Sequence, residues 1–238
     1  SMLAARFKEA GQPFVVEQIE VPSIGANDVL VNIRAAGVCG TDVHYHSGEF
    51  APYYIPLTLG HEGAGRVTAV GENVTHLQVG DPVIVHYIVS CGNCEPCLQG
   101  FDNRCRNRKS IGSHIDGTFA EYIRVPARSA LKMSETIPFD WGAIAACAVS
   151  TAYHAVDISG LHPGGTVIVF GVGGVGLHAV LWSKFFGAGT VIAIDPIDSK
   201  LSVAKEYGAD VLLNPTREDV IQAVSEITDS WGVDVAIE

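Results

Sequence analysis

Residues 166–180, TVIVFGVGGVGLHAV, indicate the architecture of the second half of the chain. Its first residues form the apolar, largely β-branched run of a strand buried on both faces, and the residues from 176 onward have the composition of a helix. The glycine turn Gly171-x-Gly173-Gly174-x-Gly176 joins the two. Asp195 follows Gly176 by nineteen residues, at the end of the next apolar run. This arrangement predicts a βαβ unit that binds a dinucleotide.

The residues of this turn have separate physical roles. Gly171 permits the tight turn, Gly173 lets the backbone approach a pyrophosphate, and Gly176 allows close packing of helix and strand. The pyrophosphate would lie at the helix N-terminus, where free N–H groups favour an anion. Asp195 would accept a hydrogen bond from the ribose 2′-OH and repel a 2′-phosphate, which favours NAD over NADP. The other loop residues expected to contact the cofactor are Gly174 and Val175. A glycine turn in a sheet that binds no nucleotide is the alternative.

The chain on either side of this unit continues the alternation of strands and helices. We expect further strands at 191–195, 211–214 and 233–238, and helices at 176–188, 199–207 and 218–230. Buried strands with helices between them form a parallel sheet, so residues 156–238 are predicted to be a doubly wound, Rossmann-type domain. A complete domain of this type has about six strands. Because fewer are predicted here, we expect that the chain is C-terminally incomplete and that Glu238 is not its natural end.

Residues 1–155 have a different character, with strands and loops in place of alternating helices. We expect strands at 3–7, 14–21, 28–37, 63–71, 81–89 and 120–126, since these runs are rich in Val and Ile and are separated by Gly, Pro and Asn. They predict a small β-barrel or sandwich-like domain. Residues 138–158 have the Ala content and length of a buried helix, with a break near Ser150 and Thr151. The whole chain is therefore predicted to be α/β, with domains 1–155 and 156–238.

Composition and charge restrict the classes of partner. Hydrophobic residues make up 47% of the chain and charged residues 17%, which excludes disorder over most of its length. The net charge is −11, so we expect neither nucleic acid nor an anionic membrane as a partner, and the charge disfavours a zinc-ribbon nucleic-acid binder. The uncharged stretch 164–183 is long enough to cross a bilayer, but its six glycines favour a strand, a turn and a helix start.

Four of the six cysteines fall within fifteen positions. We expect no signal peptide and no secreted disulfide framework, and therefore reduced cysteines in a cytoplasmic protein. Cys91-x-x-Cys94-x-x-Cys97, with Cys105 eight residues later, predicts a tetrahedral zinc site of four thiolates. Such a site is closed to substrate and is therefore structural. Unligated or disulfide-paired cysteines are the alternative. A basic cluster that would offset the negative charge of the site follows it, at Arg104, Arg106, Arg108 and Lys109.

The remaining ligand candidates are dispersed: Cys39 in GVCGTDVH, His61 in GHEGAG and Cys147 in AACAVST. Each alone means little, because a free Cys is usually a small buried hydrophobe. Together, two thiolates and an imidazole are a zinc set that leaves a fourth position open for water or substrate. We expect most other histidines to be surface or packing residues, for example His76, His114 and His162.

With these signals in this order, the chain resembles the zinc-dependent medium-chain alcohol dehydrogenases over essentially its whole length. The resemblance implies a GroES-like β-barrel followed by an NAD-binding Rossmann domain. The segment GVCGTDVH resembles the family's first zinc-ligand loop. There Cys39 would bind zinc, Thr41 would face the substrate oxygen and His44 would end the proton relay. Asp42 resembles the carboxylate that orients the zinc-bound histidine.

The same resemblance implies roles for residues in the other motifs. His61 would be the second zinc ligand, with Glu62 able to approach the metal, and Cys147 the third ligand. Cys91, Cys94, Cys97 and Cys105 match the family's structural zinc site. The positions that resemble contacts of the nicotinamide, the adenosine ribose and the substrate are, respectively, Thr151, Lys200 and Tyr87. Tyr87 is equally well explained as a packed strand aromatic. Gly40 departs from members that carry a basic residue there to contact the pyrophosphate.

The function implied is a reversible, NAD-dependent oxidation of a primary or secondary alcohol to an aldehyde or ketone, with two zinc ions per chain. Zinc would act as a Lewis acid on the alcohol oxygen, and the nicotinamide would accept the hydride. The resemblance also implies a homo-oligomer for the full-length protein. Two alternatives remain: a polyol dehydrogenase similar to sorbitol dehydrogenase, and a zinc-stabilised fragment without turnover.

Overall fold

A computed structural model describes residues 1–238. The chain forms two compact units, unit 1 (Ser1–Cys147) and unit 2 (Ala148–Glu238). The division lies directly after Cys147, whereas the domain boundary predicted from sequence follows residue 155; the functional boundary stays a prediction. No helix combines the length and the apolar character that a membrane crossing requires.

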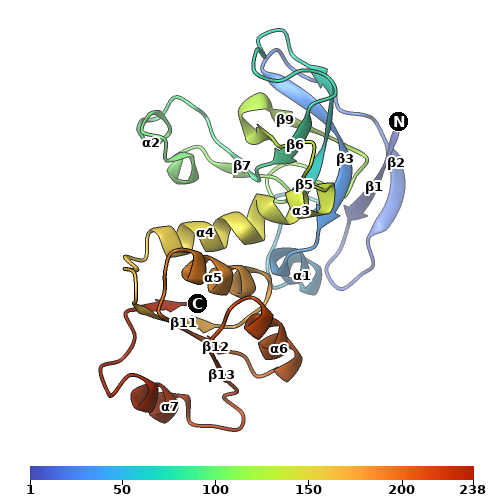
Figure 1. The fold of residues 1–238 in the computed structure, drawn as a ribbon. Coiled ribbons are helices and arrows are strands. Elements are labelled where there is room, and N and C mark those ends of the chain that lie inside the picture. Colours follow the sequence, from blue (N-terminus) through green and yellow to red (C-terminus); the bar gives the residue numbers. More distant parts are fainter. The chain divides into compact units, whose positions relative to one another are not determined.

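Unit 2 is built on a four-stranded parallel sheet with the order β13-β12-β11-β14 (Figure 1). The strands are β11 (Thr166–Phe170), β12 (Thr190–Ile194), β13 (Val211–Leu213) and β14 (Val235–Ile237). In chain order this is 3-2-1-4, the first part of the doubly wound topology. The predicted Rossmann-type parallel sheet is confirmed.

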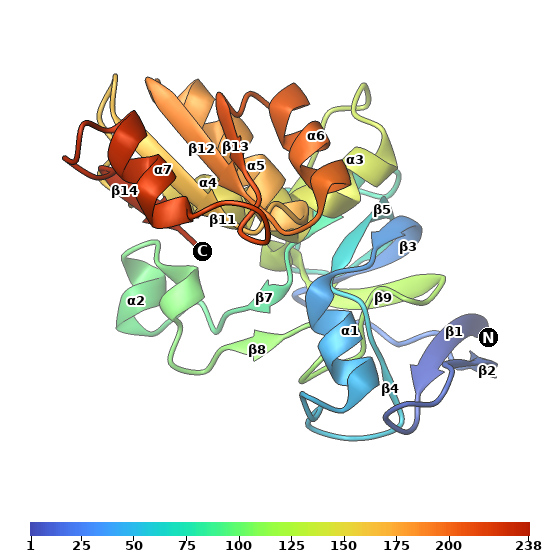
Figure 2. The same ribbon diagram turned by 90° about the horizontal axis from the view of Figure 1, so that it is seen from below.

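Both faces of this sheet are covered by helices. Val167 and Val169 of β11 point to the face that packs on α4 (Ser150–Asp157), α5 (Gly174–Phe185) and α6 (Asp198–Glu206). Their neighbour Ile168 points to the other face, where α7 (Val220–Ile227) packs (Figure 2). Because successive strand residues face opposite sides, burial on both faces requires the continuous apolar runs seen in the sequence.

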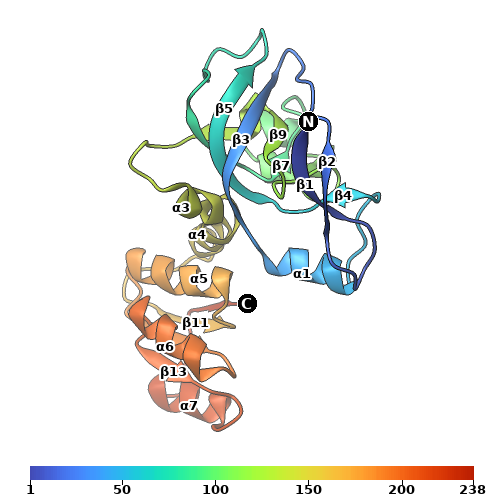
Figure 3. The same cartoon turned by 90° about the vertical axis from the view of Figure 1, so that its right-hand side faces the viewer.

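Unit 1 is predominantly antiparallel β-structure (Figure 3). A five-stranded sheet has the order β10-β6-β5-β3-β9, and a three-stranded sheet has the order β2-β1-β4. The strands of the larger sheet are β3 (Asp28–Gly37), β5 (Glu62–Val70), β6 (Pro82–Val85), β9 (Tyr122–Pro126) and β10 (Ala130–Lys132). Those of the smaller sheet are β1 (Met2–Phe7), β2 (Val15–Ile19) and β4 (Leu57–Thr58).

A short hairpin-like pair, β7 (Ile88–Val89) and β8 (Lys109–Ser110), carries a lobe with the helix α2 (Glu95–Leu98) between its strands (Figure 2). The single strand predicted at 81–89 is therefore wrong in one respect. It is divided into β6 and β7, and His86 between them donates its backbone N–H to Ser129 O, the residue before β10.

Two helical features of unit 1 differ from expectation. The helix α1 (Gly40–Ser47) was not predicted; Cys39 is its N-cap, and Asp42 completes a capping box by accepting from the Cys39 N–H. The break predicted near Ser150 and Thr151 lies earlier. Helix α3 (Phe139–Ile144) passes into a π-helical turn at Ala145–Val149, after which α4 begins. A π turn redirects the side chains it carries, and Cys147 lies within it.

Candidate functional site

Unit 1 brings the dispersed ligand candidates together. One donor atom each from Cys39, His61, Glu62 and Cys147 lie within 4.8 Å of one another. Cys39 caps α1, His61 and Glu62 stand at the start of β5, and Cys147 comes from the π-helical turn. Two sulfurs, a ring nitrogen and a carboxylate oxygen at this spacing fit a tetrahedral zinc ion.

The side chain of Asp42 forms hydrogen bonds beside this cluster and faces one of its ligands. Its side chain is only 3% exposed and accepts hydrogen bonds from the backbone N–H groups of Cys39 (2.9 Å) and Gly60 (3.2 Å). Its Oδ1 also lies 3.7 Å from His61 Nδ1. Because the Asp42 carboxylate faces Nδ1, Nε2 is the atom of His61 that can bind a metal. Metal-bound histidines commonly have such a carboxylate partner at the other ring nitrogen.

The ionisation of the cluster matches its ligand chemistry. Hydrogen bonds from Cys147 and then from His61 lower the pKa of the Cys39 thiol to about 3, which favours the thiolate that binds metals. Burial alone would lower the pKa of His61, but hydrogen bonds to Asp42 and Cys39 raise it to about 10. A metal at these donors would therefore replace a proton on His61.

The backbone before His61 is held by contacts between glycines. A Cβ atom on Gly112 would lie 2.6 Å from Gly60 O, and one on Gly117 would lie 2.1 Å from the same oxygen. Gly60 O also accepts the Thr118 N–H at 2.9 Å. The segment 59–61 therefore packs directly on the backbone of the loop 112–117, with no room for side chains.

A cavity of about 370 Å³ opens beside the ligand cluster, with His61 and Cys147 among its lining residues. Thr41 and Tyr87 also line it, as the sequence predicts for residues that face a substrate. Tyr87 packs edge-on against His61, with ring centroids 5.8 Å apart. It packs against the barrel core as well, as expected of a packed strand aromatic. A contact of Tyr87 with substrate stays a prediction. His114, expected to be a surface or packing residue, lines the cavity too.

His44 lies one turn after Thr41 on α1. Its Nδ1 is 2.5 Å from Glu49 Oε2, so the ring donates to this carboxylate and keeps Nε2 free. The side chain is exposed, which suits an exchange of protons with solvent. Glu49 was not identified from the sequence, since a glutamate in a loop carries no motif.

The four clustered cysteines also meet. One sulfur each from Cys91, Cys94, Cys97 and Cys105 lie within 4.8 Å of one another, and none of them forms a disulfide. Backbone N–H groups point at the sulfurs: those of Cys91 and Asn107 donate to Cys105 Sγ at 3.3 and 3.4 Å. Hydrogen bonds from the backbone of Asn93 and Cys94 lower the pKa of the Cys91 thiol to about 6. Four sulfurs with N–H partners fit a structural zinc ion.

A salt bridge ties this lobe to the barrel. The Arg128 guanidinium donates to both oxygens of Asp102, at 2.9 and 3.0 Å. Arg128 belongs to the barrel segment between β9 and β10, and Asp102 lies in the lobe just before Cys105. The sequence did not reveal this pair, because 26 residues separate its members.

In unit 2 the glycine turn connects β11 to α5. Gly171 has φ +79°, and a Cβ atom on Gly176 would lie 1.9 Å from Gly171 O. Gly173 is the N-cap of α5, which begins with Gly174 and Val175. The first N–H groups of α5 have no side-chain cap and are available to an anion such as a pyrophosphate.

Asp195 follows β12 and is 3% exposed. Its oxygens accept the backbone N–H groups of Val172 (3.1 Å) and Ile197 (2.9 Å), and Lys200 Nζ lies 3.7 Å from Oδ2. The carboxylate thus also fixes the glycine turn, a role not expected from the sequence. Thr151 lies exposed near the start of α4.

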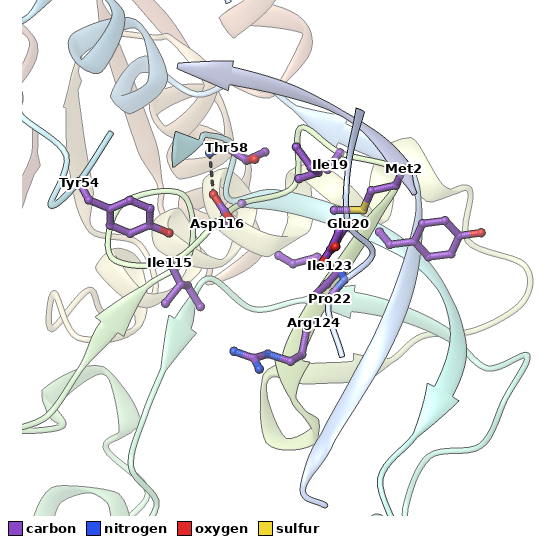
Figure 4. A pocket seen from close by; sticks show the side chains of 13 residues that line it. Met2, Ile19, Glu20, Pro22, Tyr54, Thr58, Ile115, Asp116, Ile123 and Arg124 are labelled. Carbon is purple, nitrogen blue, oxygen red and sulfur yellow. Dashed lines mark hydrogen bonds between the residues drawn. The ribbon is translucent and has the colours of Figure 1, made fainter. Parts of the chain in front are cut away.

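A second cavity of unit 1, of about 210 Å³, lies beside the N-terminal strands (Figure 4). Asp116 in its wall accepts the Thr58 N–H at 2.8 Å and pairs with Arg6. No cysteine or histidine lines this cavity, so it offers none of the thiolate or imidazole ligands found in the two clusters.

Comparisons with known proteins agree with this geometry. Two family models match: the alcohol dehydrogenase GroES-like domain over residues 25–135 and the zinc-binding dehydrogenase over residues 174–238. An alcohol dehydrogenase of Geobacillus stearothermophilus is 39% identical over 227 residues, which cover 94% of this chain and 67% of the relative. An L-threonine 3-dehydrogenase of Symbiobacterium thermophilum is 38% identical over 244 residues, 100% of this chain and 68% of the relative.

Among solved structures, a protein from Sinorhizobium meliloti 1021 bound to NADP has a TM-score of 0.87 and 38% identity, over 94% of this chain and 64% of that one. The chain spans about two thirds of the length of the curated relatives that it matches. The resemblance predicted from sequence is confirmed by these matches. The chain therefore belongs to the zinc-dependent medium-chain dehydrogenases, a family of NAD(P)-dependent oxidoreductases.

Proposed function

We propose that the protein, at its full length, oxidises a primary or secondary alcohol reversibly to an aldehyde or ketone with NAD. The observation that carries the proposal is the cluster of Cys39, His61 and Cys147 donors beside a cavity lined by the Thr41 hydroxyl. When bound, zinc would supply Lewis acidity and the nicotinamide would accept a hydride. The substrates are a small alcohol and the corresponding carbonyl compound.

In this proposal Cys39, His61 and Cys147 would hold a zinc ion, and Glu62, whose carboxylate oxygen lies within 4.8 Å of their donor atoms, could serve as a further ligand. Asp42 keeps the His61 ring in the orientation that presents Nε2. Thr41 Oγ1 would accept the proton of the substrate hydroxyl and release its own hydrogen to the relay. The relay ends at His44. Because the hydrogen on its Nδ1 is donated to Glu49, the Nε2 atom of the neutral ring can accept a proton.

The second proposed zinc ion is held by Cys91, Cys94, Cys97 and Cys105 and serves stability alone, since four sulfurs leave no open position. The cofactor is proposed to lie on the turn from Gly171 to Gly176. Asp195 and Lys200 would bind the adenosine ribose, and the negative charge of Asp195 favours NAD over NADP. Thr151 is proposed to lie near the nicotinamide.

Two further proposals concern the whole protein. A cytoplasmic location is supported by the six cysteines, which form two ligand sets and no disulfide, as reducing compartments favour. A homo-oligomer at full length is proposed on the basis of family resemblance, and light scattering of the purified full-length protein tests it.

The decisive experiment is NAD reduction by the full-length enzyme with a panel of primary and secondary alcohols. Cys39→Ser and His61→Gln are expected to abolish turnover, while both retain the zinc of the four-cysteine site. His76→Gln is the matched control, because His76 is not among the ligand candidates and its ring hydrogen-bonds a backbone carbonyl, Ala127 O at 3.4 Å. Full activity of Cys39→Ser would refute the proposed site. Calorimetric titration with NADH separates an enzyme from a fragment that binds zinc without turnover.

A further inference from the structure

The chain turns back on itself directly after helix α1. Gly48 follows the last residue of the helix with φ +83°, and a Cβ atom there would lie 3.0 Å from Ala10 Cβ. The Gly48 N–H donates to Tyr45 O, and the Phe50 N–H donates to His44 O, both at 3.1 Å. These bonds close a C-terminal cap of the kind that a left-handed glycine permits. The residues after Gly48 therefore lie beside the last turn of α1.

The returning loop holds the His44 ring on two sides. Glu49 Oε2 lies 2.5 Å from Nδ1, and the centroid of the Phe50 ring lies 4.9 Å from that of the imidazole, with the planes inclined by 40°. Because an ionised carboxylate has no hydrogen to donate, Nδ1 carries the hydrogen of this bond. The loop thus selects one orientation and one neutral tautomer of His44.

The tautomer determines whether His44 can take part in the proposed relay. A neutral imidazole accepts a hydrogen bond or a proton at only one of its two nitrogens. With its hydrogen on Nε2 the ring could not accept there, and the relay that starts at Thr41 would stop. The side chain of His44 is 44% exposed, so water alone would leave both tautomers accessible.

Glu49 is the carboxylate that pairs with His44. The other acidic residue of α1, Asp42, is 3% exposed and accepts the backbone N–H groups of Cys39 and Gly60 instead. When Nε2 accepts a proton the ring becomes a cation, and the negative charge of Glu49 then lies against it. An exposed ion pair of this kind gives a modest stabilisation.

We propose that Glu49 is a positioning residue of the proton relay, which keeps the hydrogen of neutral His44 on Nδ1 and faces the imidazolium that forms during turnover. This inference rests on the proposed alcohol dehydrogenase function. For each alcohol oxidised, His44 Nε2 gains one proton from the relay and gives one proton to water. The hydrogen on Nδ1 and the charge of Glu49 stay unchanged, so Glu49 acts only through His44.

Nitrogen-15 NMR of the histidine rings tests the tautomer in the full-length zinc enzyme. The signals of His44 are assigned by their loss in His44→Gln. We expect the native neutral ring to have the nitrogen shifts of a hydrogen on Nδ1. In Glu49→Gln both tautomers should be populated, because an amide can either accept from Nδ1 or donate to it. A native ring with its hydrogen on Nε2 would overturn the inference.

Rapid mixing tests the role in turnover, with NAD and the best substrate of the alcohol panel described above, both saturating. In Glu49→Gln the rate of NADH formation in the first turnover is expected to fall about three- to tenfold, as suits the loss of an exposed ion pair and of part of one tautomer. The solvent deuterium isotope effect should rise, and imidazole added to the buffer should restore part of the rate. NAD affinity and zinc content should be unchanged, and Glu49→Asp should retain part of the native rate.

Glu135→Gln is the matched control, because Glu135 is 64% exposed against 62% for Glu49 and pairs with Arg66 of β5. Its rate and isotope effect should equal those of the native enzyme. A native rate in Glu49→Gln would overturn the inference and leave the proposed function standing. So would a lower rate without a larger isotope effect or rescue by imidazole, since that result indicates a purely structural role. Failure of the native enzyme to oxidise any alcohol would overturn the proposed function and the inference with it.

Discussion

Asp42→Ala tests the link between the fold of unit 1 and its metal ligands. The substitution removes a carboxylate that accepts two backbone N–H groups, the half-buried one of Cys39 at 2.9 Å and the buried one of Gly60 at 3.2 Å. A buried donor left without a partner costs about 1–3 kcal/mol, so the Gly60 N–H alone predicts a loss of that size in the free energy of unfolding, and the half-buried Cys39 N–H adds a smaller amount. Loss of the carboxylate 3.7 Å from His61 Nδ1 should also weaken zinc binding by about 10- to 100-fold.

Both effects can be measured on one preparation. Urea unfolding followed by fluorescence gives the stability, and competition with a chromophoric chelator under reducing conditions gives the zinc affinities. We expect the affinity of one zinc ion to fall while that of the four-cysteine site is unchanged. Asp42→Asn, which keeps one acceptor oxygen, should lie between the native protein and Asp42→Ala in both measurements.

Asp81→Ala is the matched control. Asp81 is also buried and accepts a backbone N–H, that of Gln78 at 3.0 Å, but it pairs with Lys132 and contacts no ligand residue. It should lose stability without losing zinc affinity. If Asp42→Ala binds both zinc ions as tightly as Asp81→Ala does, Asp42 does not position His61, and the reasoning is refuted.

Three further predictions follow from single contacts. Gly176→Ala places a Cβ atom 1.9 Å from Gly171 O, so calorimetry should show NADH binding weakened by at least about tenfold; native affinity would contradict the close packing. Cys105→Ser should lower the zinc content from about two to about one per chain by elemental analysis, and an unchanged content would exclude the four-sulfur site. The pKa of Asp81 is held below its usual value by hydrogen bonds from Lys132 and the backbone. Its contribution to stability is therefore complete above the ordinary carboxyl pKa and is lost as the pH falls through the lowered value. Asp81→Asn should accordingly flatten the acid side of the Tm profile, and a profile parallel to the native one would contradict this.

Much of the fold could be predicted because the relevant signals are local. The strand at 28–37 has the predicted bounds, since its alternating burial follows from its own residues. The strand at 166–170 could be predicted from its β-branched residues, and the glycine turn from its place between this strand and the start of a helix. These signals are neighbours in the chain. The helix α1 was missed because its N-cap is Cys39, and cysteine is not among the residues that usually begin a helix.

The metal ligands of the candidate site could be predicted, because few residue types bind zinc. The parts of the site that depend on loops meeting in the fold could not. Thiolates and imidazole at Cys39, His61 and Cys147 are recognisable residue by residue, and their donors do meet. The environment of His114 depends on Tyr53 and Ser110, which reach it through the fold and through a turn without a motif. The π turn that carries Cys147 likewise has no simple sequence signal, because one additional residue in a helical turn depends on packing.

The contact among Gly60, Gly112 and Gly117 has a consequence for how this enzyme can diversify. The two loop glycines flank Ser113 and His114 and rest on the backbone that precedes His61. The loop is thus anchored at both ends by main-chain atoms, while Ser113 and His114 between the anchors line the cavity beside the ligand cluster. A library randomised at 113 and 114 can therefore explore new substrates without shifting the metal ligand, whereas a side chain at either glycine, or an inserted residue between them, would displace it.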